Sequence, residues 1–286
     1  MSEPAHPPPI RFDGQVVLIT GAGRGLGAAY ARLIASRGGA VVVHDAGVAQ
    51  DGSGFDPSVA DAVAAEITAA GGIAAACYEN LEDVAACGRV VEFVVTRFGR
   101  IDGLIHNAGL VVFATLEETR IAVWDRMVKI GVSAPFHLAR AAVPHMRRQS
   151  YGRIVLTTSG RAMRVENCVP GLAAYSAAKM AQVGLMVGLA AELRDANIQV
   201  NAISPVAATR VLRREAPELA PELVAPAVAF LASAACEISG AVVHAAGGCF
   251  SLRWWERGPL LELGPAPASP EDMALLWRQT TAIAPT

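Results

Sequence analysis

The sequence lacks an excess of charge of either sign. Among its 286 residues, 24 lysines and arginines are balanced by 26 aspartates and glutamates, and the formal net charge is −2. A protein that binds a nucleic-acid backbone carries a surplus of basic residues, so we expect no nucleic-acid partner. Charged residues make up only 17% and hydrophobic residues 53% of the chain, which favours a globular protein with a large buried core over a disordered one.

Long apolar runs are also missing. The longest stretch without Asp, Glu, Lys or Arg, residues 238–252, has 15 residues, whereas a helix needs about 20 apolar residues to span a membrane. We therefore expect no membrane span. The first residues show no basic region followed by an apolar run, so the sequence predicts no secretory signal and a cytoplasmic protein.

Patterns that ligate metals are absent as well. The five cysteines form no CxxC pair, and the six histidines form no HExxH motif. Widely spaced cysteines of odd number, in a chain without a secretory signal, are expected to be reduced thiols. The sequence thus predicts no metal site.

What the sequence does contain is a regular alternation of short apolar runs and longer alanine-rich segments. Continuous apolarity predicts strands that are buried on both faces, and the alternation predicts a parallel sheet with helices on both faces. We expect one α/β doubly wound (Rossmann) domain with a seven-stranded parallel sheet. The expected strands are 15–20, 40–44, 73–77, 101–106, 153–158, 198–203 and 241–244. The expected helices are 25–37, 58–70, 82–98, 117–149, 172–195 and 221–233.

The two ends of the chain differ from this pattern. Residues 1–11 are rich in proline and predict a flexible arm, so the nucleotide-binding domain with its catalytic site is expected over 12–250. Residues 251–286 form a C-terminal extension. Within it, Ser269 followed by Pro270 and two acidic residues is typical of a helix start, which predicts a short helix there.

A glycine-rich segment, residues 20–27 (TGAGRGLG), lies between the first expected strand and the first expected helix. Glycines allow the backbone to approach a pyrophosphate, and the helix N-terminus offers free N–H groups and a positive dipole end. Strand and helix on either side give the context that a dinucleotide loop requires. The alternative is a turn whose glycines serve packing alone. The predicted cofactor contacts in this segment are Gly21, Arg24, Gly25, Leu26 and Gly27.

Asp45 follows the second expected strand and bears on the choice between NAD and NADP. Its carboxylate can accept hydrogen bonds from both ribose hydroxyls of adenosine. A 2′-phosphate at about 4 Å would be repelled by roughly 4 kcal/mol per unit of charge at an effective dielectric constant near 20. Arg24 favours NADP instead, because an arginine in this loop can bind a 2′-phosphate. We expect the carboxylate to decide, so NAD is the predicted cofactor and NADP the less favoured one.

Tyr175 and Lys179 are four residues apart and therefore share one face of a helix. An ammonium group beside a phenol is expected to stabilise the phenolate and lower the pKa of Tyr175 from about 10, which suits proton exchange near neutrality. Such a pair is also common on protein surfaces. Ser159 makes the functional interpretation stronger, because it follows a strand at the edge of the sheet where α/β proteins bind ligands.

These motifs together resemble the short-chain dehydrogenases/reductases. The resemblance covers about residues 12–250 and rests on five matching segments: TGAGRGLG, the HNAG sequence 106–109, Ser159, YSAAK at 175–179 and NAISP at 201–205. It implies that Tyr175 is the general acid/base, that Lys179 binds the nicotinamide ribose, and that Ser159 orients the substrate oxygen. The further cofactor contacts it implies are Asn107, Ala108 and Gly109 near adenosine, Glu79 or Asn80 near adenine, and Pro205, Val206 and Thr209 near the nicotinamide.

A narrower resemblance concerns the substrate. The loop 46–57, the segments YGRIVLTTSG and LAAYSAAK, and the late LRWWERG are similar to the (3R)-hydroxyacyl-CoA dehydrogenase unit of multifunctional β-oxidation enzymes of type 2. This implies a lipid-like or acyl-CoA substrate, including steroid side-chain thioesters. A hydroxysteroid dehydrogenase and a 3-oxoacyl carrier-protein reductase stay open as alternatives. So does a protein of another class, an NAD-binding sensor or scaffold with little turnover.

The sequence also departs from the family pattern. Gly131 stands where the family often has an asparagine that helps to position a relay water, and Val206 replaces a glycine. His106 replaces the first Asn of NNAG and is expected to be packed rather than catalytic. The distance from Ser159 to Tyr175 is 16 residues, against a usual spacing near 13, which predicts a longer loop beside the substrate with Cys168 in it.

Two predictions concern partners. Arg210, Arg213 and Arg214 cluster after the sixth expected strand, where they either meet the phosphates of coenzyme A or form a solvated charged face. The family pairs its long helices, here 117–149 and 172–195, so the resemblance implies a homodimer or homotetramer. The alanine-rich composition of these helices suits close contact between them.

Overall fold

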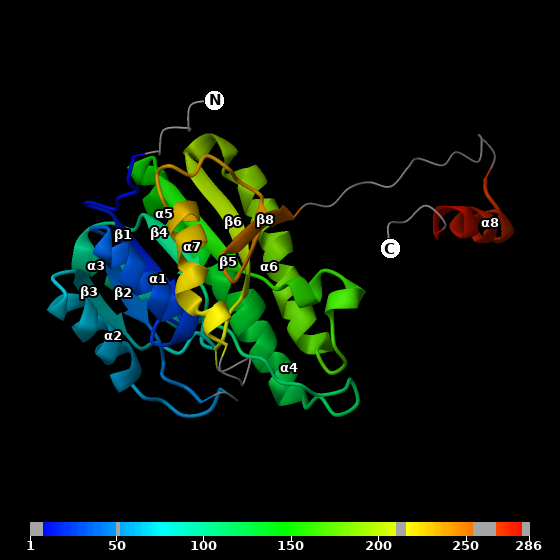
Figure 1. Cartoon of the computed structure of the whole chain (residues 1–286), viewed down its shortest axis with the longest axis horizontal. Helices are drawn as coiled ribbons and strands as arrows, with labels where there is room; N and C mark the ends of the chain where they lie inside the picture. The colour runs from blue at the N-terminus through cyan, green and yellow to red at the C-terminus, as the bar shows by residue number, and fades with distance from the viewer. Residues whose placement is uncertain (1–7, 50–51, 210–215, 254–266, 282–286) are drawn as a thin grey trace. The chain divides into compact units, whose positions relative to one another are not determined.

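An eight-stranded sheet forms the centre of the chain up to Arg253 (Figure 1). The computed structural model describes residues 8–49, 52–209, 216–253 and 267–281. The strand order is β3-β2-β1-β4-β5-β6-β7-β8, with β1 to β7 parallel and β8 antiparallel to β7. The strands are β1 Val16–Thr20, β2 Ala40–His44, β3 Ile73–Cys77, β4 Gly103–His106, β5 Gly152–Thr157, β6 Ile198–Val206, β7 Val242–Ala246 and β8 Cys249–Arg253.

Helices cover both faces of this sheet, which explains why the strands are apolar throughout (Figure 1). Along β1, Val17 and Ile19 belong to the hydrophobic core on one face of the sheet, whereas Val16 and Leu18 belong to the core on the other face. Successive side chains of a strand point to opposite faces, so both sets are buried. The doubly wound α/β class is confirmed. The helices are α1 Gly25–Ser36, α2 Ser58–Ala69, α3 Val84–Phe98, α4 Ile121–Val128, α5 Ala134–Gln149, α6 Ala173–Glu192 and α7 Ala225–Leu231.

The expected helix 117–149 is interrupted in the structure. A π-turn, Lys129–Ser133, joins α4 to α5, and Gly131 at its centre is buried. A Cβ atom on Gly131 would lie 2.8 Å from the Cβ of Ala178 on α6, closer than such atoms approach in proteins. The absence of a side chain therefore lets the turn rest directly on α6.

The strand count differs from the seven expected. Gly247 and Gly248, with φ of 55° and 78°, form a tight turn, and the chain returns along β7 as β8. Two residues with positive φ are typical of a hairpin turn of type I′. The last expected strand was 241–244, and the sequence predicted no strand after these glycines, so β8 was missed.

The chain divides into two compact units, Met1–Arg253 and Trp254–Thr286. The second contains the helix α8, Pro270–Thr281, close to where the sequence predicts one. Ser269 and Asp272 form a reciprocal cap at its start: Asp272 N–H donates to Ser269 Oγ (3.1 Å), and Ser269 N–H donates to the Asp272 carboxylate (2.9 Å). Among the helices described, none combines the length and apolarity that a membrane crossing requires.

Candidate active site

The carboxyl ends of β1 and β4 meet at Thr20. Its Oγ1 accepts hydrogen bonds from the backbone N–H groups of Asn107 (3.2 Å) and Ala108 (3.1 Å), and it lies 3.1 Å from His106 Nδ1. The Asn107 side chain donates to the Gly21 carbonyl at 3.0 Å. The glycine loop and the HNAG segment are thus joined, as the strand order predicts for the point where a doubly wound sheet reverses direction.

The backbone of the glycine loop is packed too closely for side chains at two of its glycines. A Cβ atom on Gly27 would lie 2.1 Å from the Gly21 carbonyl oxygen, and one on Gly21 would lie 2.9 Å from the Cα of Ala108. The first helix, α1, begins at Gly25, and the side chain of Arg24 makes no capping hydrogen bond to it. The free N–H groups of this helix end suit an anion such as a pyrophosphate. These residues therefore fit a dinucleotide cofactor.

Asp45 stands beside this loop. Its carboxylate accepts hydrogen bonds from the backbone N–H groups of Gly23 (3.0 Å) and Gly47 (2.8 Å). Each carboxylate oxygen has a further lone pair, so the group can still accept from a ribose. The guanidinium of Arg24 donates to the Val48 carbonyl at 3.3 Å. The loop after β2 thus anchors Arg24 through a backbone oxygen.

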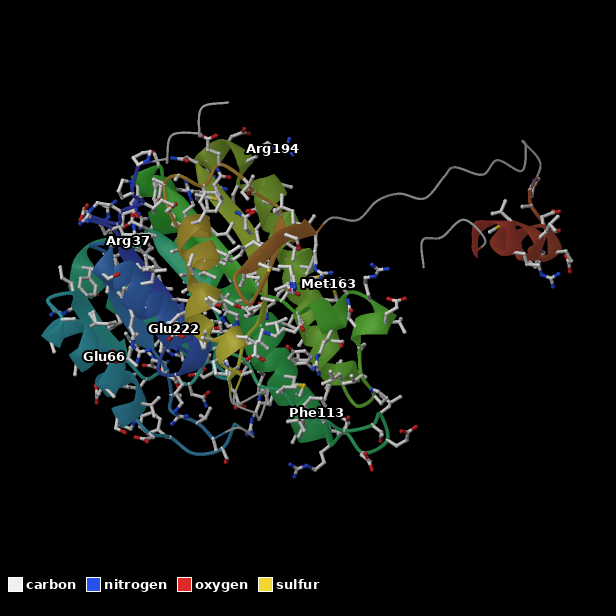
Figure 2. The ribbon with its side chains drawn as sticks, viewed as in Figure 1. Arg37, Glu66, Phe113, Met163, Arg194 and Glu222 are labelled. Carbon is white, nitrogen blue, oxygen red and sulfur yellow. The ribbon has the colours of Figure 1, made fainter. Side chains whose placement is uncertain are left out.

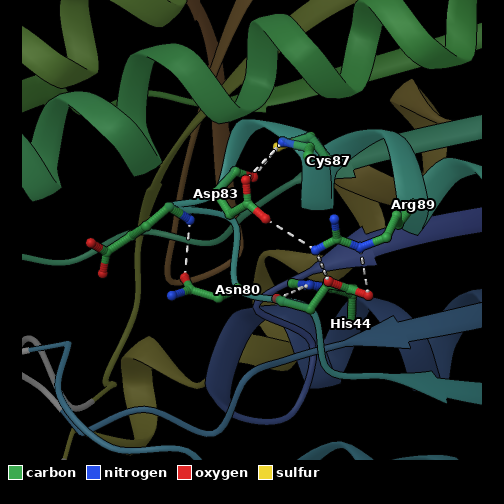
Figure 3. A network of polar contacts seen from close by, with 8 residues as sticks. His44, Asn80, Asp83, Cys87 and Arg89 are labelled. Atoms are coloured by element: carbon green, nitrogen blue, oxygen red, sulfur yellow. Dashed lines mark hydrogen bonds and ion pairs between the residues drawn. The ribbon is translucent and has the colours of Figure 1, made fainter.

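Glu79 and Asn80 follow β3 in a polar network (Figure 3). The Glu79 carboxylate is paired with Arg89 at 2.7 Å, and this guanidinium lowers the pKa of Glu79. Arg89 also contacts Asp83 at 3.1 Å. Asn80 Oδ1 accepts from the N–H of Glu82 at 3.0 Å. The network shapes the end of β3 beside the loop, and the expected adenine contact of these residues stays a prediction.

Ser159, Tyr175 and Lys179 come together from the segment that follows β5 and from α6. Ser159 is buried, and its hydroxyl lies close enough to Tyr175 to lower the pKa of that phenol. The Lys179 ammonium lies 5.9 Å from the centroid of the Tyr175 ring and donates to the Thr157 carbonyl at 2.8 Å. The Lys179 carbonyl in turn accepts from Thr158 Oγ1 at 2.8 Å. The end of β5 and the residue after it therefore hold Lys179 in place, and Ser159 follows directly.

The pKa of Tyr175 differs from the sequence-based expectation. Burial raises this pKa, while the hydrogen bond from Ser159 and the positive charge of Arg161 lower it only in part. Lys179 is not among the groups that lower it. Its ammonium is bound to a backbone carbonyl, and burial lowers the pKa of Lys179 itself to about 8. The expectation that Lys179 makes this phenol acidic is thus not met.

The cofactor-facing segments also approach one another. A Cβ atom on Gly109 would lie 3.3 Å from the Lys179 ammonium, and one on Gly25 would lie 3.2 Å from the Thr209 side chain. Pro205 and Val206 end β6. The segment after β4 thus approaches α6, and the glycine loop after β1 approaches the segment after β6. The predicted arginine cluster, Arg210, Arg213 and Arg214, lies outside the described residues.

His106 is packed, as expected, but it is also bonded at both ring nitrogens. It is fully buried, and its Nε2 lies 3.0 Å from the Ile130 carbonyl in the π-turn. Burial lowers the pKa of His106 to about 3, and the Lys179 charge acts in the same direction. Cys168 lies in the longer loop, partly buried, with Sγ 3.7 Å from Ser176 Oγ.

Sequence reasoning missed two residues of the site. Thr20 links two backbone N–H groups and the His106 ring, and its position before the first glycine was the available signal. Arg161 follows Ser159 by two residues, its N–H donates to Ser159 Oγ at 3.3 Å, and its charge acts on Tyr175. Its place in the longer loop could have drawn attention to it. Across the described ranges, no group of three or more His, Cys, Asp or Glu side chains is placed to hold a metal ion.

Comparison with known proteins gives consistent matches. The family model described as short chain dehydrogenase matches residues 15–218. The chain is 38% identical to the mouse peroxisomal multifunctional enzyme type 2 and 38% identical to the Saccharomyces cerevisiae peroxisomal hydratase-dehydrogenase-epimerase, with 95% of this chain covered in each case. It spans only 37% and 30% of the lengths of these two relatives. A putative short-chain type dehydrogenase/reductase of Mycobacterium tuberculosis is 36% identical, with 93% of this chain and 94% of the relative covered.

Solved structures agree with these matches. A short chain dehydrogenase from Mycobacterium avium superposes with a TM-score of 0.84 at 34% identity, covering 96% of this chain and 97% of the other. A 7α-hydroxysteroid dehydrogenase complexed with NADH and 7-oxo glycochenodeoxycholic acid gives 0.74 at 30% identity, covering 83% and 95%. A metagenomic short-chain oxidoreductase in complex with NADP gives 0.66 at 34% identity, covering 77% and 91%.

Proposed function

The chain belongs to the short-chain dehydrogenase/reductase family and is an oxidoreductase that acts on CH–OH groups; from this premise we propose that it is NAD-dependent and oxidises (3R)-hydroxyacyl-CoA or reduces the matching ketone. The observation that carries the proposal is the meeting of Ser159, Tyr175 and Lys179 beside the glycine loop. The relatives whose names include multifunctional enzyme and hydratase-dehydrogenase-epimerase support the acyl-type substrate.

Each of the three side chains has a separate role in the proposed reaction. Tyr175 removes the hydroxyl proton during oxidation and returns it during reduction, and Ser159 donates a hydrogen bond to the same substrate oxygen. Lys179, which donates to the Thr157 carbonyl, would bind the nicotinamide ribose. The bound NAD supplies the hydride acceptor at its nicotinamide. The chain itself therefore provides orientation, proton transfer and a partly buried site.

The preference for NAD rests on Asp45. Its carboxylate is held at the glycine loop by Gly23 and Gly47, so it cannot easily turn away from a bound ribose. A 2′-phosphate would meet this fixed negative charge. The nearest described cation in the loop, Arg24, is already directed to the Val48 carbonyl. Both observations support NAD over NADP as the cofactor.

Apolar side chains around the site support a lipid-like substrate. The loops 110–120 and 160–172 are linked by a hydrogen bond from the Ala114 N–H to the Gly171 carbonyl at 3.0 Å. Each loop carries a large apolar side chain, Phe113 on the first and Met163 on the second (Figure 2). Phe113 is 49% and Leu116 77% exposed, so apolar surface is available to cover an acyl chain. The exposed apolar residues on these loops are Phe113, Leu116, Val165 and Val169.

Three alternatives have specific support. The solved hydroxysteroid dehydrogenase supports a hydroxysteroid substrate, and a relative named 3-oxoacyl-[acyl-carrier-protein] reductase supports a carrier-protein substrate. An NAD-binding sensor or scaffold with little turnover is favoured by the raised pKa of Tyr175 and by Gly131. The intact trio of Ser159, Tyr175 and Lys179 argues for turnover.

A substrate panel tests these alternatives. The purified chain is mixed with NAD or NADP and with (3R)- and (3S)-hydroxyacyl-CoA, a hydroxysteroid and a simple secondary alcohol, and NADH formation is followed by absorbance. Turnover of the (3R)-thioester with NAD supports the proposal. Tight NAD binding without turnover of any alcohol would instead favour the sensor.

Two further parts of the proposal concern assembly and compartment. The chain is proposed to form a homodimer or homotetramer through α5 and α6, where a hollow of about 290 Å³ is lined by residues such as Phe136, His137 and Leu185. The cytoplasmic location stays a prediction, since relatives with peroxisomal names are also similar to this chain.

A further inference from the structure

His106 connects two parts of the site, although the steps proposed above do not use it. It ends β4 and is fully buried. One ring nitrogen, Nδ1, lies 3.1 Å from Thr20 Oγ1 at the glycine loop. The other, Nε2, lies 3.0 Å from the Ile130 carbonyl in the π-turn. A single imidazole therefore bridges the cofactor loop and the turn between α4 and α5.

The hydrogen bonds of Thr20 determine which ring nitrogen carries the proton. Thr20 Oγ1 accepts from the N–H groups of Asn107 and Ala108, so both of its acceptor positions are used. Its own proton is then directed to His106 Nδ1, which acts as the acceptor. The ring proton is left on Nε2 and is donated to the Ile130 carbonyl. The low pKa of His106, about 3, keeps this neutral form across the physiological range.

The π-turn is contacted from outside its own helix. Its wide turn interrupts the regular hydrogen-bond ladder, and such turns are rare, occur mostly as single turns inside α-helices and are frequent at functional sites. Two neighbouring residues of the turn make contacts with other elements. The Ile130 carbonyl accepts a hydrogen bond from His106, and Gly131 packs against Ala178. Ala178 directly precedes Lys179 on α6. The turn is thus held against the part of α6 that carries the ammonium group.

We propose that His106 is a positioning residue for the reaction, whose Nε2–H holds the Ile130 carbonyl and thereby keeps the π-turn packed over the α6 segment that carries Lys179. The inference rests on the proposed function, because it gives His106 a role in that same site. Without this bond the turn can relax toward a regular helix, and water gains access to Lys179.

The consequence is measurable at Lys179. The titratable groups that face it are Tyr175 on the same helix and His106 on β4. Burial lowers the pKa of Lys179 to about 8. Water that enters beside the ammonium favours its charged form. Loss of the hydrogen bond from His106 to the Ile130 carbonyl is therefore expected to raise the pKa of Lys179. The neutral imidazole itself adds no charge to the site.

The chain offers a direct probe, because Lys129 and Lys179 are its only lysines. Lysine labelled with ¹³C at Cε gives two NMR signals, and a Lys129→Arg variant assigns them. The exposed Lys129 serves as the internal reference in every pH titration. This readout requires no turnover, so it tests the inference even if no alcohol of the panel is a substrate, an outcome that would count against the proposed function alone.

Three variants separate positioning from general packing. His106→Leu removes both hydrogen bonds, whereas His106→Gln places a side-chain N–H near the position of Nε2. His44→Leu is the matched control, since His44 is a buried histidine whose Nε2 also bonds a carbonyl, that of Glu79, at 2.8 Å. We expect His106→Leu to raise the Lys179 pKa by about one pH unit. His106→Gln should restore most of the wild-type pKa, and His44→Leu should leave the Lys179 pKa unchanged.

Turnover provides the second readout. With the best substrate of the panel, His106→Leu is expected to lower kcat about tenfold while the substrate KM changes less than about threefold, as for a misplaced reacting group. The inference is overturned if His106→Leu leaves the Lys179 titration unchanged, if His106→Gln is no closer to wild type than His106→Leu, or if His44→Leu shifts Lys179 equally.

Discussion

The phenol of Tyr175 is the residue on which proton transfer depends. Tyr175→Phe keeps the ring but removes the hydroxyl, so kcat is expected to fall by about 10²- to 10⁴-fold, the usual contribution of a general acid/base. NAD affinity, measured by calorimetry, should stay within about twofold of wild type, because the binding loop is untouched. Since burial raises the pKa of Tyr175, oxidation should accelerate with rising pH above neutrality and reduction should slow.

The matched control for this variant is Tyr151→Phe. Tyr151 directly precedes β5 at its amino end, away from the strand end that bears Ser159, so its loss should leave kcat unchanged. If Tyr175→Phe and Tyr151→Phe retained equal activity, Tyr175 could not be the proton-transfer group.

The carboxylate of Asp45 is the residue that decides between the two cofactors. Asp45→Asn keeps an oxygen acceptor for a backbone N–H but removes the negative charge that faces a 2′-phosphate. We expect the ratio of kcat/KM for NAD to that for NADP to fall by about tenfold or more, since the repulsion reaches roughly 4 kcal/mol at close range. Steady-state kinetics with both cofactors measures the ratio. Asp83→Asn, at the start of α3, is the control and should leave it unchanged.

The π-turn is the element that determines how closely α4–α5 approaches α6. Gly131→Ala places a Cβ atom 2.8 Å from that of Ala178, so the turn must move away from Lys179. We expect kcat to fall about tenfold and the free energy of unfolding to fall by about 1–3 kcal/mol, as in other overpacked cores. Gly131→Asn, which installs the residue that the family often has here, is expected to reduce turnover as well.

Urea unfolding and steady-state kinetics check this prediction. The control is Gly88→Ala on α3, where an added Cβ has no atom within 4 Å. That exposed helical site should gain about 0.5–1 kcal/mol of stability, because alanine favours a helix over glycine. A Gly131→Asn variant more active than wild type would show that the turn has room for a side chain.

The elements also show how far the sequence alone predicts this protein. The buried strands were predictable because apolar runs such as VVLIT leave no polar face, and the Ser159, Tyr175 and Lys179 set followed from the strand end and the helical spacing. Strand β8 was not, because half-exposed CFSLR resembles a loop and pairs only through the Gly247–Gly248 turn. The π-turn and the raised pKa of Tyr175 depend on contacts with Ala178 and on burial, which spacing along the chain does not encode.

At the scale of the whole molecule, the helix pair α5–α6 is the surface proposed for self-association. Phe136 is 47% and Val187 53% exposed on these two helices, which is costly for a surface left open to water. Phe136→Glu should convert the proposed homo-oligomer to monomer in light scattering after size-exclusion chromatography. Phe93→Glu on α3 is the control and should keep the wild-type mass. Equal masses for the two variants would place the interface elsewhere.

The buried histidines make the stability of the whole fold depend on pH. The pKa of His106 is about 3 in the folded chain against 6.5 for an exposed histidine, so the unfolded chain binds an additional proton between these values. The free energy of unfolding should therefore fall as pH decreases below 6.5, by up to a few kcal/mol, on the order of 1.4 per pKa unit. Urea titrations at several pH values measure this slope. His106→Gln should make it shallower, and an unchanged slope would mean that His106 does not titrate as described.

The π-turn at Lys129–Ser133 also determines how α5, the helix that follows it, is rotated about its own axis. One residue advances an α-helix by about 100°, and a π-turn contains one residue more than the regular ladder needs. Leu138, Ala142 and Met146 consequently face inward, whereas Phe136 faces out. Deleting one residue from the turn would rotate α5 by that angle and exchange its lining. The π-turn that packs beside Lys179 thus also determines which side of α5 is exposed to solvent.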